Sequence, residues 1–232
     1  MPPLPEGAFA DYACASHDRL APMPVNLTFE QAAAVPVAGI TALWAVRDVG
    51  RVQPGQKVLV NGASGGVGTY AVQLARALGA QVTGVCSAGN ADLVRSLGAE
   101  EVLDYTAADY TRSGGRYDVV VDIAGGRPFV ACRRLLTPKG SYVAVGGPAG
   151  QWLQPVGHIF SALALGPLVS QRVALVQPVQ ADHTQNLLSL TAFIESGEVT
   201  PVIDRSYAFE QIPAAIAYQE QGHAPGKVVI TF

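Results

Sequence analysis

The sequence has few cysteines, and those it has are isolated. Cys14, Cys86 and Cys132 are odd in number and far apart, and none belongs to a CxxC or Cys/His cluster. This argues against a disulfide framework and supplies no ligand set for zinc. The first six residues have neither the basic stretch nor the apolar core of a signal peptide. We therefore expect a cytoplasmic protein that binds no metal.

Charged residues are scarce as well. They make up 14% of the sequence, and the net charge of −3 is not accompanied by a basic block. We therefore expect neither nucleic acid nor an anionic membrane surface as a partner. No apolar run is long enough to span a bilayer, although 49% hydrophobic residues are ample for a buried core. A small-molecule ligand fits this composition best.

A glycine-rich turn follows the first clear strand pattern. The apolar run 58–60 leads into Asn-Gly-Ala-Ser-Gly-Gly-Val-Gly and then into a helical pattern over 69–78. In a dinucleotide-binding unit, such glycines allow a tight turn and close approach of the backbone to a pyrophosphate, which the N–H groups at the helix start then face. An ordinary strand-to-helix corner also favours glycine. The pattern itself predicts a phosphate-binding turn between this strand and this helix.

Strand and helix patterns alternate after this turn. A helical pattern over 91–97 separates two apolar runs, as parallel βαβ units require. The fold class predicted is therefore α/β, with a doubly wound parallel sheet. Ligands of such sheets bind at the carboxyl ends of the strands. The predicted strands after the first are 81–86, 101–103, 118–122, 139–145 and 172–176.

The two ends of the chain have less regular patterns. A strand is predicted at Phe9 to Ala15, within a proline-rich segment. Thr28 is predicted to cap a helix with Gln31 as its capping-box partner, and the helical pattern continues to Val49 with an interruption around Pro36 to Gly39. Toward the carboxyl end, the predicted elements are helices at 159–165, 182–196 and 209–219 and strands at 202–203 and 227–232.

Several separated motifs carry a family resemblance. They are the glycine-rich turn, the helix Gly39-Ile40-Thr41-Ala42, the pairs Leu97-Gly98-Ala99 and Asp104-Tyr105, and the ending Gly222-His223-Ala224-Pro225-Gly226-Lys227-Val228-Val229. Over residues 7–232 the chain resembles the medium-chain dehydrogenase/reductases, specifically their zinc-free quinone oxidoreductase-like branch. The resemblance implies a Rossmann nucleotide-binding domain and an N-terminal GroES-like barrel, with the active site between them.

Most of that barrel has no counterpart in this sequence. The resemblance divides the chain into a remnant of the GroES-like β domain at 1–40, a Rossmann domain at 41–176, and a segment at 177–232 that ends the Rossmann domain and returns to the remnant. Residues 9–15, 202–206 and 227–232 then look like barrel strands without partners, whose edges proteins usually pair or cover. Either they form a small sheet of their own, or a partner covers them.

The resemblance also implies a nicotinamide cofactor. The residues that match the family's pyrophosphate loop are Ser64, Gly65, Gly66, Val67 and Gly68. Thr41 matches a position at the nicotinamide end, although its hydroxyl also fits a bond within its own helix. The second strand ends in Cys86-Ser87, without the carboxylate that holds the ribose of NAD. NADPH is therefore expected, with Ser87 at its 2′-phosphate and Tyr105 at its adenosine end. Further contacts implied are Ala124, Gly125, Val145, Gly146, Gly147, His223, Ala224 and Lys227.

Some of these contacts have a second explanation. The glycines also fit plain turns, and Lys227 also fits a strand edge. Gly89 and Pro225 stand where the family often has basic residues, which removes two possible phosphate partners. A hydroxyl at Ser87 can still donate a hydrogen bond to a phosphate. The sequence therefore predicts an NADPH site of reduced affinity.

The expected function is the reduction of a small organic substrate, a quinone or an enone, by NADPH without zinc. In this branch the polar groups that orient substrate come mainly from the missing barrel, so no catalytic residue is predicted. The alternative is a truncated relative repurposed for non-redox work: small-molecule binding, a cofactor-free cyclisation or a regulatory partner role. Both readings predict a homodimer that pairs the edge strand at 172–176 across a two-fold axis.

Overall fold

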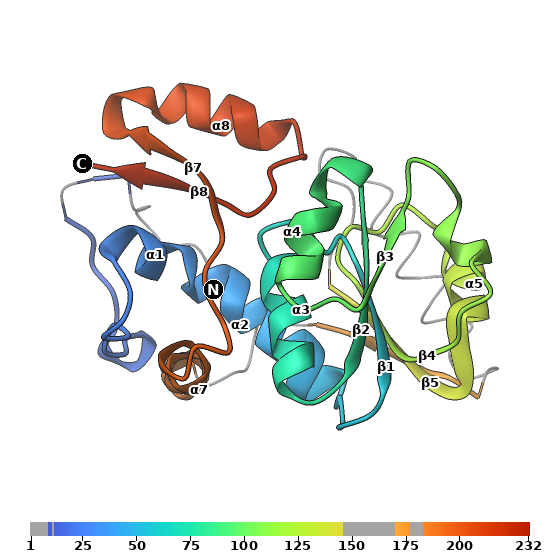
Figure 1. Cartoon of the computed structure of the whole chain (residues 1–232). Helices are drawn as coiled ribbons and strands as arrows, with labels where there is room; N and C mark the ends of the chain where they lie inside the picture. Colours follow the sequence, from blue (N-terminus) through green and yellow to red (C-terminus); the bar gives the residue numbers. More distant parts are fainter. Residues whose placement is uncertain (1–8, 11, 146–169, 177–182) are drawn as a thin grey trace.

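Six parallel strands form the central sheet (Figure 1). The computed structural model describes residues 9–10, 12–145, 170–176 and 183–232. The strand order is β3-β2-β1-β4-β5-β6, so the order reverses between β1 and β4, where ligands of such sheets bind. The strands are β1 (Lys57–Asn61), β2 (Gln81–Cys86), β3 (Glu101–Asp104), β4 (Tyr117–Asp122), β5 (Leu136–Ala144) and β6 (Arg172–Leu175). The predicted doubly wound α/β class and its six strands are confirmed.

Helices cover both faces of this sheet and create two hydrophobic cores. On β1, Val58 and Val60 belong to the larger core, whereas Leu59 points to the opposite face and packs with Phe129. Both faces of a doubly wound sheet are buried in this way. The flanking helices include α3 (Gly68–Ala77), α4 (Ala91–Ser96) and α5 (Phe129–Cys132), and the short helical segments are η1 (His17–Arg19), η2 (Trp44–Val49), η3 (Ala88–Asn90), η4 (Tyr110–Arg112), η5 (Arg133–Leu135) and η8 (Phe209–Gln211).

The capping box at Thr28 is confirmed. Thr28 Oγ1 accepts from the Gln31 N–H at 3.3 Å, and the Gln31 side chain accepts from the Thr28 N–H at 3.0 Å, at the start of α1 (Phe29–Ala34). The predicted interruption at Pro36 to Gly39 is wrong in its place. The break falls at Val35, and Pro36 begins α2 (Pro36–Leu43), because proline needs no N–H partner in the first turn of a helix.

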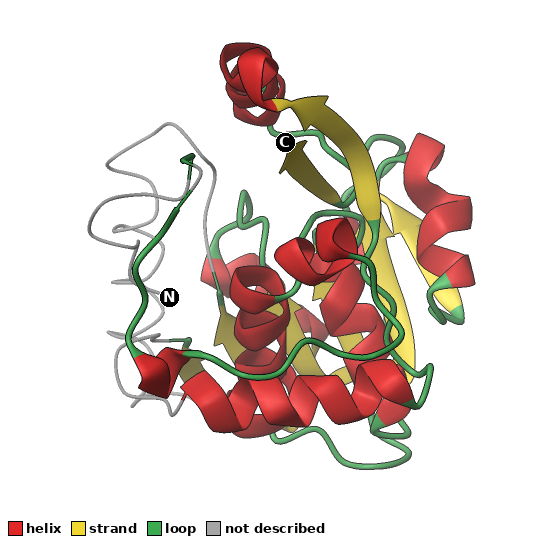
Figure 2. Cartoon of the chain, turned by 90° about the vertical axis from the view of Figure 1, so that its left-hand side faces the viewer, coloured by secondary structure: helices red, strands yellow, loops and turns green. Residues whose placement is uncertain are grey.

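The predicted strand at Phe9 to Ala15 is wrong for the described residues of that segment. Residues 12–15 pair with no described strand, and the side chain of Tyr12 is 93% exposed. An alternating sequence becomes a strand only where a neighbour accepts its backbone hydrogen bonds. Figure 2 shows this part of the chain as a loop.

The carboxyl-terminal segment forms a second, smaller unit. It contains β7 (Ile203–Ala208), α8 (Ile212–Glu220) and β8 (Lys227–Thr231). The two strands pair with each other in parallel, which for these two segments is the first of the two predicted alternatives, a small sheet of their own. The helix α8 provides the crossover that a parallel pair needs. Both views place this small sheet at one end of the molecule, away from the six-stranded sheet (Figures 1 and 2).

The helix α7 (His183–Glu195) precedes this unit and packs on α2. It corresponds to the helix predicted at 182–196. Asp182 and the helix predicted at 159–165 lie outside the described residues. Within the described residues, none of the helices combines the length and the apolar character needed to cross a membrane.

Candidate functional site

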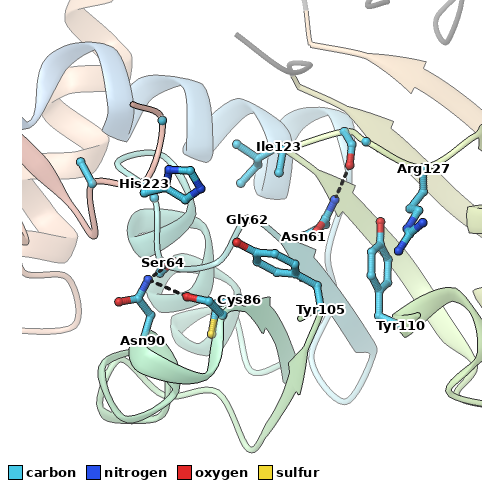
Figure 3. Close-up of a pocket in the computed structure, with 17 residues that line it drawn as sticks. Asn61, Gly62, Ser64, Cys86, Asn90, Tyr105, Tyr110, Ile123, Arg127 and His223 are labelled. Carbon is cyan, nitrogen blue, oxygen red and sulfur yellow. Dashed lines mark hydrogen bonds between the residues drawn. The ribbon is translucent and has the colours of Figure 1, made fainter. Parts of the chain in front are cut away.

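A pocket of about 480 Å³ opens at the carboxyl ends of β1, β2, β3 and β4 (Figure 3). This is the edge of the sheet at which the strand order reverses. The loop that follows β1 forms one wall, and the loop before β8 contributes His223 on the same side as Ser64. The lining residues are Asn61, Gly62, Ser64, Gly65, Cys86, Ser87, Asn90, Tyr105, Tyr110, Ile123, Ala124, Gly125, Gly126, Arg127, Gly222, His223 and Ala224.

The glycine-rich turn has a backbone that only glycine permits at two positions. Gly62 has φ +84, and a Cβ there would lie 3.0 Å from the Cβ of Ala124. A Cβ on Gly68 would lie 2.0 Å from the carbonyl oxygen of Gly62, so α3 can begin this close to β1 only without a side chain. Within the described residues, the N–H groups of Gly66 and Val67 make no hydrogen bond. They are free to donate to an anion at the start of α3.

Asn90 joins the glycine-rich turn to the end of β2. Its Nδ2 donates to Ser64 Oγ at 3.2 Å and to Ser87 Oγ at 3.3 Å (Figure 3). Because each serine oxygen accepts from the same amide, each hydroxyl keeps its own proton for donation to another group. The arrangement therefore holds two hydroxyl donors side by side at the mouth of the pocket.

No carboxylate ends β2, as expected from Cys86-Ser87. The nearest acidic residue on the neighbouring strand, Asp104, uses its carboxylate to accept from the N–H and hydroxyl of Thr106, at 2.8 and 2.7 Å. These hydrogen bonds lower the pKa of Asp104. This carboxylate is therefore engaged with its own turn, while Tyr105 turns its ring to the pocket (Figure 3).

A buried carboxylate fixes the loop at the end of β4. Asp122 Oδ1 accepts from Asn61 Nδ2 at 2.7 Å and from the N–H of Gly125 at 2.9 Å, and Asp122 Oδ2 accepts from the Tyr142 hydroxyl. Asn61 Nδ2 also donates to the Gly125 carbonyl at 3.1 Å. The backbone of the 124–126 loop is thus held against the end of β1, where it lines the pocket.

The tyrosines and the thiol behind this loop are kept neutral. Burial, with the charge of Asp122 adding to it, raises the pKa of Tyr142, and burial likewise raises the pKa of Tyr110. Burial raises the pKa of Cys132 to about 12. A thiol with such a pKa is not a nucleophile near neutral pH, so this cluster supports the loop and does not provide a reactive cysteine.

Lys227 approaches the glycine-rich turn from β8. A Cβ built on Gly66 would lie 2.8 Å from Lys227 Cδ, so the lysine stem lies directly on the loop. The residue is half-buried, and desolvation lowers the pKa of Lys227. No hydrogen bond or ion pair of its ammonium group occurs within the described residues. A desolvated cation next to free backbone N–H groups is suited to bind a phosphate.

The structure brings about half of the predicted cofactor contacts together in one pocket. Gly66, Val67, Gly68 and Lys227 adjoin it without lining it. Thr41 and Val145 are not among the lining residues. The Thr41 hydroxyl donates to the Val37 carbonyl of its own helix at 2.7 Å. Gly146 and Gly147 lie outside the described residues. The predicted residues that line the pocket are Ser64, Gly65, Ser87, Tyr105, Ala124, Gly125, His223 and Ala224.

Sequence reasoning missed four polar residues that line the pocket. Asn61 could have been found, because it is the polar residue that ends the first strand. Asn90, Tyr110 and Arg127 come from loops and short helices whose side-chain directions the sequence does not give. Arg127 lies near Asp109, with Nε 3.6 Å from the carboxylate.

The comparisons with known proteins agree with this geometry. A family model described as zinc-binding dehydrogenase matches residues 97–230, more than half of the chain. The chain belongs to the medium-chain dehydrogenase/reductases. A chloroplast envelope quinone oxidoreductase homolog from Arabidopsis thaliana is 36% identical to this dehydrogenase/reductase over 97% of the chain and 68% of the relative.

Two further relatives show how the length of this chain compares with that of other proteins of the family. The mitochondrial NAD(P)H oxidoreductase RTN4IP1 of Mus musculus is 32% identical over 99% of this chain, which spans 62% of that protein. The quinone oxidoreductase from Coxiella burnetii superposes with a TM-score of 0.82 at 28% identity, over 95% of this chain and 66% of that structure. This dehydrogenase/reductase therefore spans about two thirds of the length of its relatives.

Proposed function

We propose that this protein is an oxidoreductase that uses NADPH to reduce a small organic substrate, a quinone or an enone. The observation that carries the proposal is the glycine-rich turn with free N–H groups at Gly66 and Val67, beside two hydroxyl donors at Ser64 and Ser87. The pocket lies where doubly wound sheets bind nucleotides. The names of the relatives, which are quinone and NAD(P)H oxidoreductases, support the same reaction class.

The preference for NADPH over NADH rests on the end of β2. A carboxylate there would accept from the 2′-hydroxyl of NADH and repel a 2′-phosphate. This chain instead presents Ser87, whose oxygen accepts from Asn90 and whose proton is free to donate. Arg95 does not add a cation, because it pairs with Asp92 at 2.9 Å on the exposed face of α4. We expect hydroxyl and amide groups, and not a strong ion pair, to hold the 2′-phosphate.

The bound cofactor would supply the hydride, and this chain would orient it. The turn after β1 and Lys227 would hold the pyrophosphate, and the 124–126 loop, held by Asp122, would border the ribose and nicotinamide. We assign no catalytic residue and no proton donor. We also propose that the reaction is independent of zinc; within the described residues, no group of three or more His, Cys, Asp or Glu side chains could hold a metal ion.

We further propose a cytoplasmic homodimer. β6 ends the central sheet, and Val173, Ala174 and Leu175 are only half-buried there, so a second copy could extend the sheet across a two-fold axis. A partner over the half-buried β7 and β8 is a further possibility for the assembly. Light scattering tests the dimer, and a monomer mass would contradict it.

Fluorescence titration with NADPH and with NADH tests the proposed function. We expect saturable enhancement by both, with NADPH bound about tenfold more tightly. Ser87→Ala should reduce that preference, while Ser96→Ala, on the exposed side of α4, is the matched control. Oxidation of the bound NADPH by a panel of quinones and enones would then identify the substrate class.

Absence of binding to either nucleotide would overturn the reductase proposal. The non-redox alternative would then apply: small-molecule binding, a cofactor-free cyclisation or a regulatory role in a protein that keeps the nucleotide scaffold. Binding of nucleotide without oxidation by any acceptor would separate a working cofactor site from a working reductase.

A further inference from the structure

A single buried glutamine connects the nucleotide loop to the carboxyl-terminal sheet. Gln73 lies on α3, the helix that begins at the end of the glycine-rich turn, and it is only 6% exposed. Its Oε1 accepts from the Thr200 N–H at 2.8 Å, and its Nε2 donates to the Thr200 carbonyl at 3.0 Å. Nε2 also donates to the Thr69 carbonyl at 2.9 Å. The Gln73 amide therefore binds both backbone polar groups of Thr200.

Thr200 is close in the chain to the residue that pairs with the start of β8. Two residues further on, the Val202 carbonyl accepts from the Lys227 N–H at 2.8 Å. Gly226 has φ +116, and a Cβ there would lie 2.7 Å from the Val202 oxygen, so only glycine allows this approach. The backbone of Lys227 is thereby fixed to the segment that Gln73 holds.

These contacts lead from α3 through Thr200 and β8 back to the glycine-rich turn. From β8, the Lys227 side chain returns to Gly66, two residues before the start of α3. The helix that carries Gln73 and the loop that receives Lys227 are therefore one continuous piece of chain. Val199, the neighbour of Thr200, is buried in the larger core, and β8 also packs on α1. The hydrogen bonds of Gln73 to Thr200 add the polar link between this segment and α3.

We propose that Gln73 is a positioning residue that, by clasping the backbone of Thr200, holds Lys227 against the glycine-rich turn. The small sheet thereby becomes a functional part of the nucleotide site, because it supplies a cation beside the glycine-rich turn. The role of this cation toward phosphate rests on the proposed function, whereas the positioning itself does not.

The first test measures the environment of Lys227 without any nucleotide. The chain has three lysines, Lys57, Lys139 and Lys227, so the signals of ¹³C-dimethylated lysines can be assigned by substitution, with the exposed Lys57 and Lys139 as internal references. Desolvation lowers the pKa of Lys227 in the wild type. Gln73→Leu should return this pKa toward its ordinary value, and Gln81→Leu, the same change at an exposed position, should not.

The second test measures nucleotide binding. Gln73→Leu and Lys227→Met should each raise the Kd for NADPH about tenfold, the size expected for one charge-assisted hydrogen bond. The double variant should stay near tenfold and not reach a hundredfold, because both changes remove the same contact. Both single variants should also weaken the dependence of Kd on salt concentration, which a general loss of stability would not do.

Gln73→Glu keeps the acceptor for the Thr200 N–H and loses both donors, and it replaces Gln73→Leu if that variant does not fold. An unchanged pKa of Lys227 in a folded Gln73 variant, or additive effects in the double variant, would overturn the positioning role. Failure of the wild type to bind any nucleotide would instead overturn the proposed function, and the Lys227 pKa would still decide the role of Gln73.

Discussion

The central sheet and the small β7–β8 sheet are both parallel, yet they are stabilised in different ways. Strands β1 and β4 are buried on both faces, with Val58, Leu59 and Val60 fully inaccessible. In β7 and β8 most residues are half-buried or exposed, and Val229 is the buried exception. The central sheet is held by hydrophobic burial on its two faces, and the small sheet by α8, α1 and a few polar links.

The nucleotide site therefore combines a rigid backbone turn from the central sheet with a flexible side chain from the small sheet. The turn after β1 is fixed by backbone contacts that tolerate no added atom at Gly68. Lys227 comes from the less buried sheet, and its flexible stem lies beside Gly66. Substitutions of matched chemistry in the two regions should therefore differ in their effects, and the following predictions run from the largest difference to the smallest.

Gly68→Ala should be the most damaging small substitution. Its Cβ would lie 2.0 Å from the Gly62 oxygen, which is backbone and cannot move aside cheaply. We expect a loss of about 3 kcal/mol in the free energy of unfolding, measured by urea titration, and loss of NADPH binding. Gly89→Ala, where nothing lies within 4 Å, should change the free energy by less than about 0.5 kcal/mol. Equal effects would contradict the rigidity of the turn.

The substitution of valine by alanine should cost more stability in the central sheet than in the small sheet. Val60→Ala, in the fully buried centre of β1, should lower the free energy of unfolding by about 2 kcal/mol through lost burial and a residual cavity. Val228→Ala, half-buried on β8, should cost less than about 1 kcal/mol. A cost at Val228 as large as that at Val60 would show that the small sheet has a core of its own.

Removing a tyrosine hydroxyl should show a similar contrast. Tyr142→Phe takes a donor from the buried Asp122, so we expect a loss of about 2 kcal/mol in thermal or urea unfolding. Tyr218 donates to Asp204 at 2.6 Å in the small unit and is only half-buried. Tyr218→Phe should therefore cost about 0.5 kcal/mol. The reverse order would contradict the support that Asp122 gives to the 124–126 loop.

The pH dependence of stability should report the buried thiol. The pKa of Cys132 is raised to about 12 in the folded protein, so between its ordinary value and pH 12 the folded state binds more protons than the unfolded state, and stability falls as pH rises. At pH 10, one unit above the ordinary pKa of 9.0, this amounts to about 1.4 kcal/mol. Cys132→Ala should flatten that decline relative to the wild type, while Cys14→Ala, at an exposed position, should leave it unchanged.

The sequence predicted the central sheet well because its signals are local. Each strand is a short apolar run, and the turn after β1 combines glycine with the start of a helix, so both could be identified from neighbouring residues alone. The capping box at Thr28 was predicted for the same reason. The lack of a carboxylate after Cys86 is likewise readable in the sequence.

Other features depend on residues far apart in the chain, and only the tertiary structure determined them. The segment at Phe9 to Ala15 has a strand-like pattern, but its described residues pair with no strand in the described part of the chain. In contrast, β7 and β8 pair with each other. Asn90 reaches two serines because a short helix turns its amide toward them, and Gln73 meets Thr200 across 127 residues of sequence. Local pattern determines which elements form, but hydrogen-bond partners at long range are set only when those elements pack.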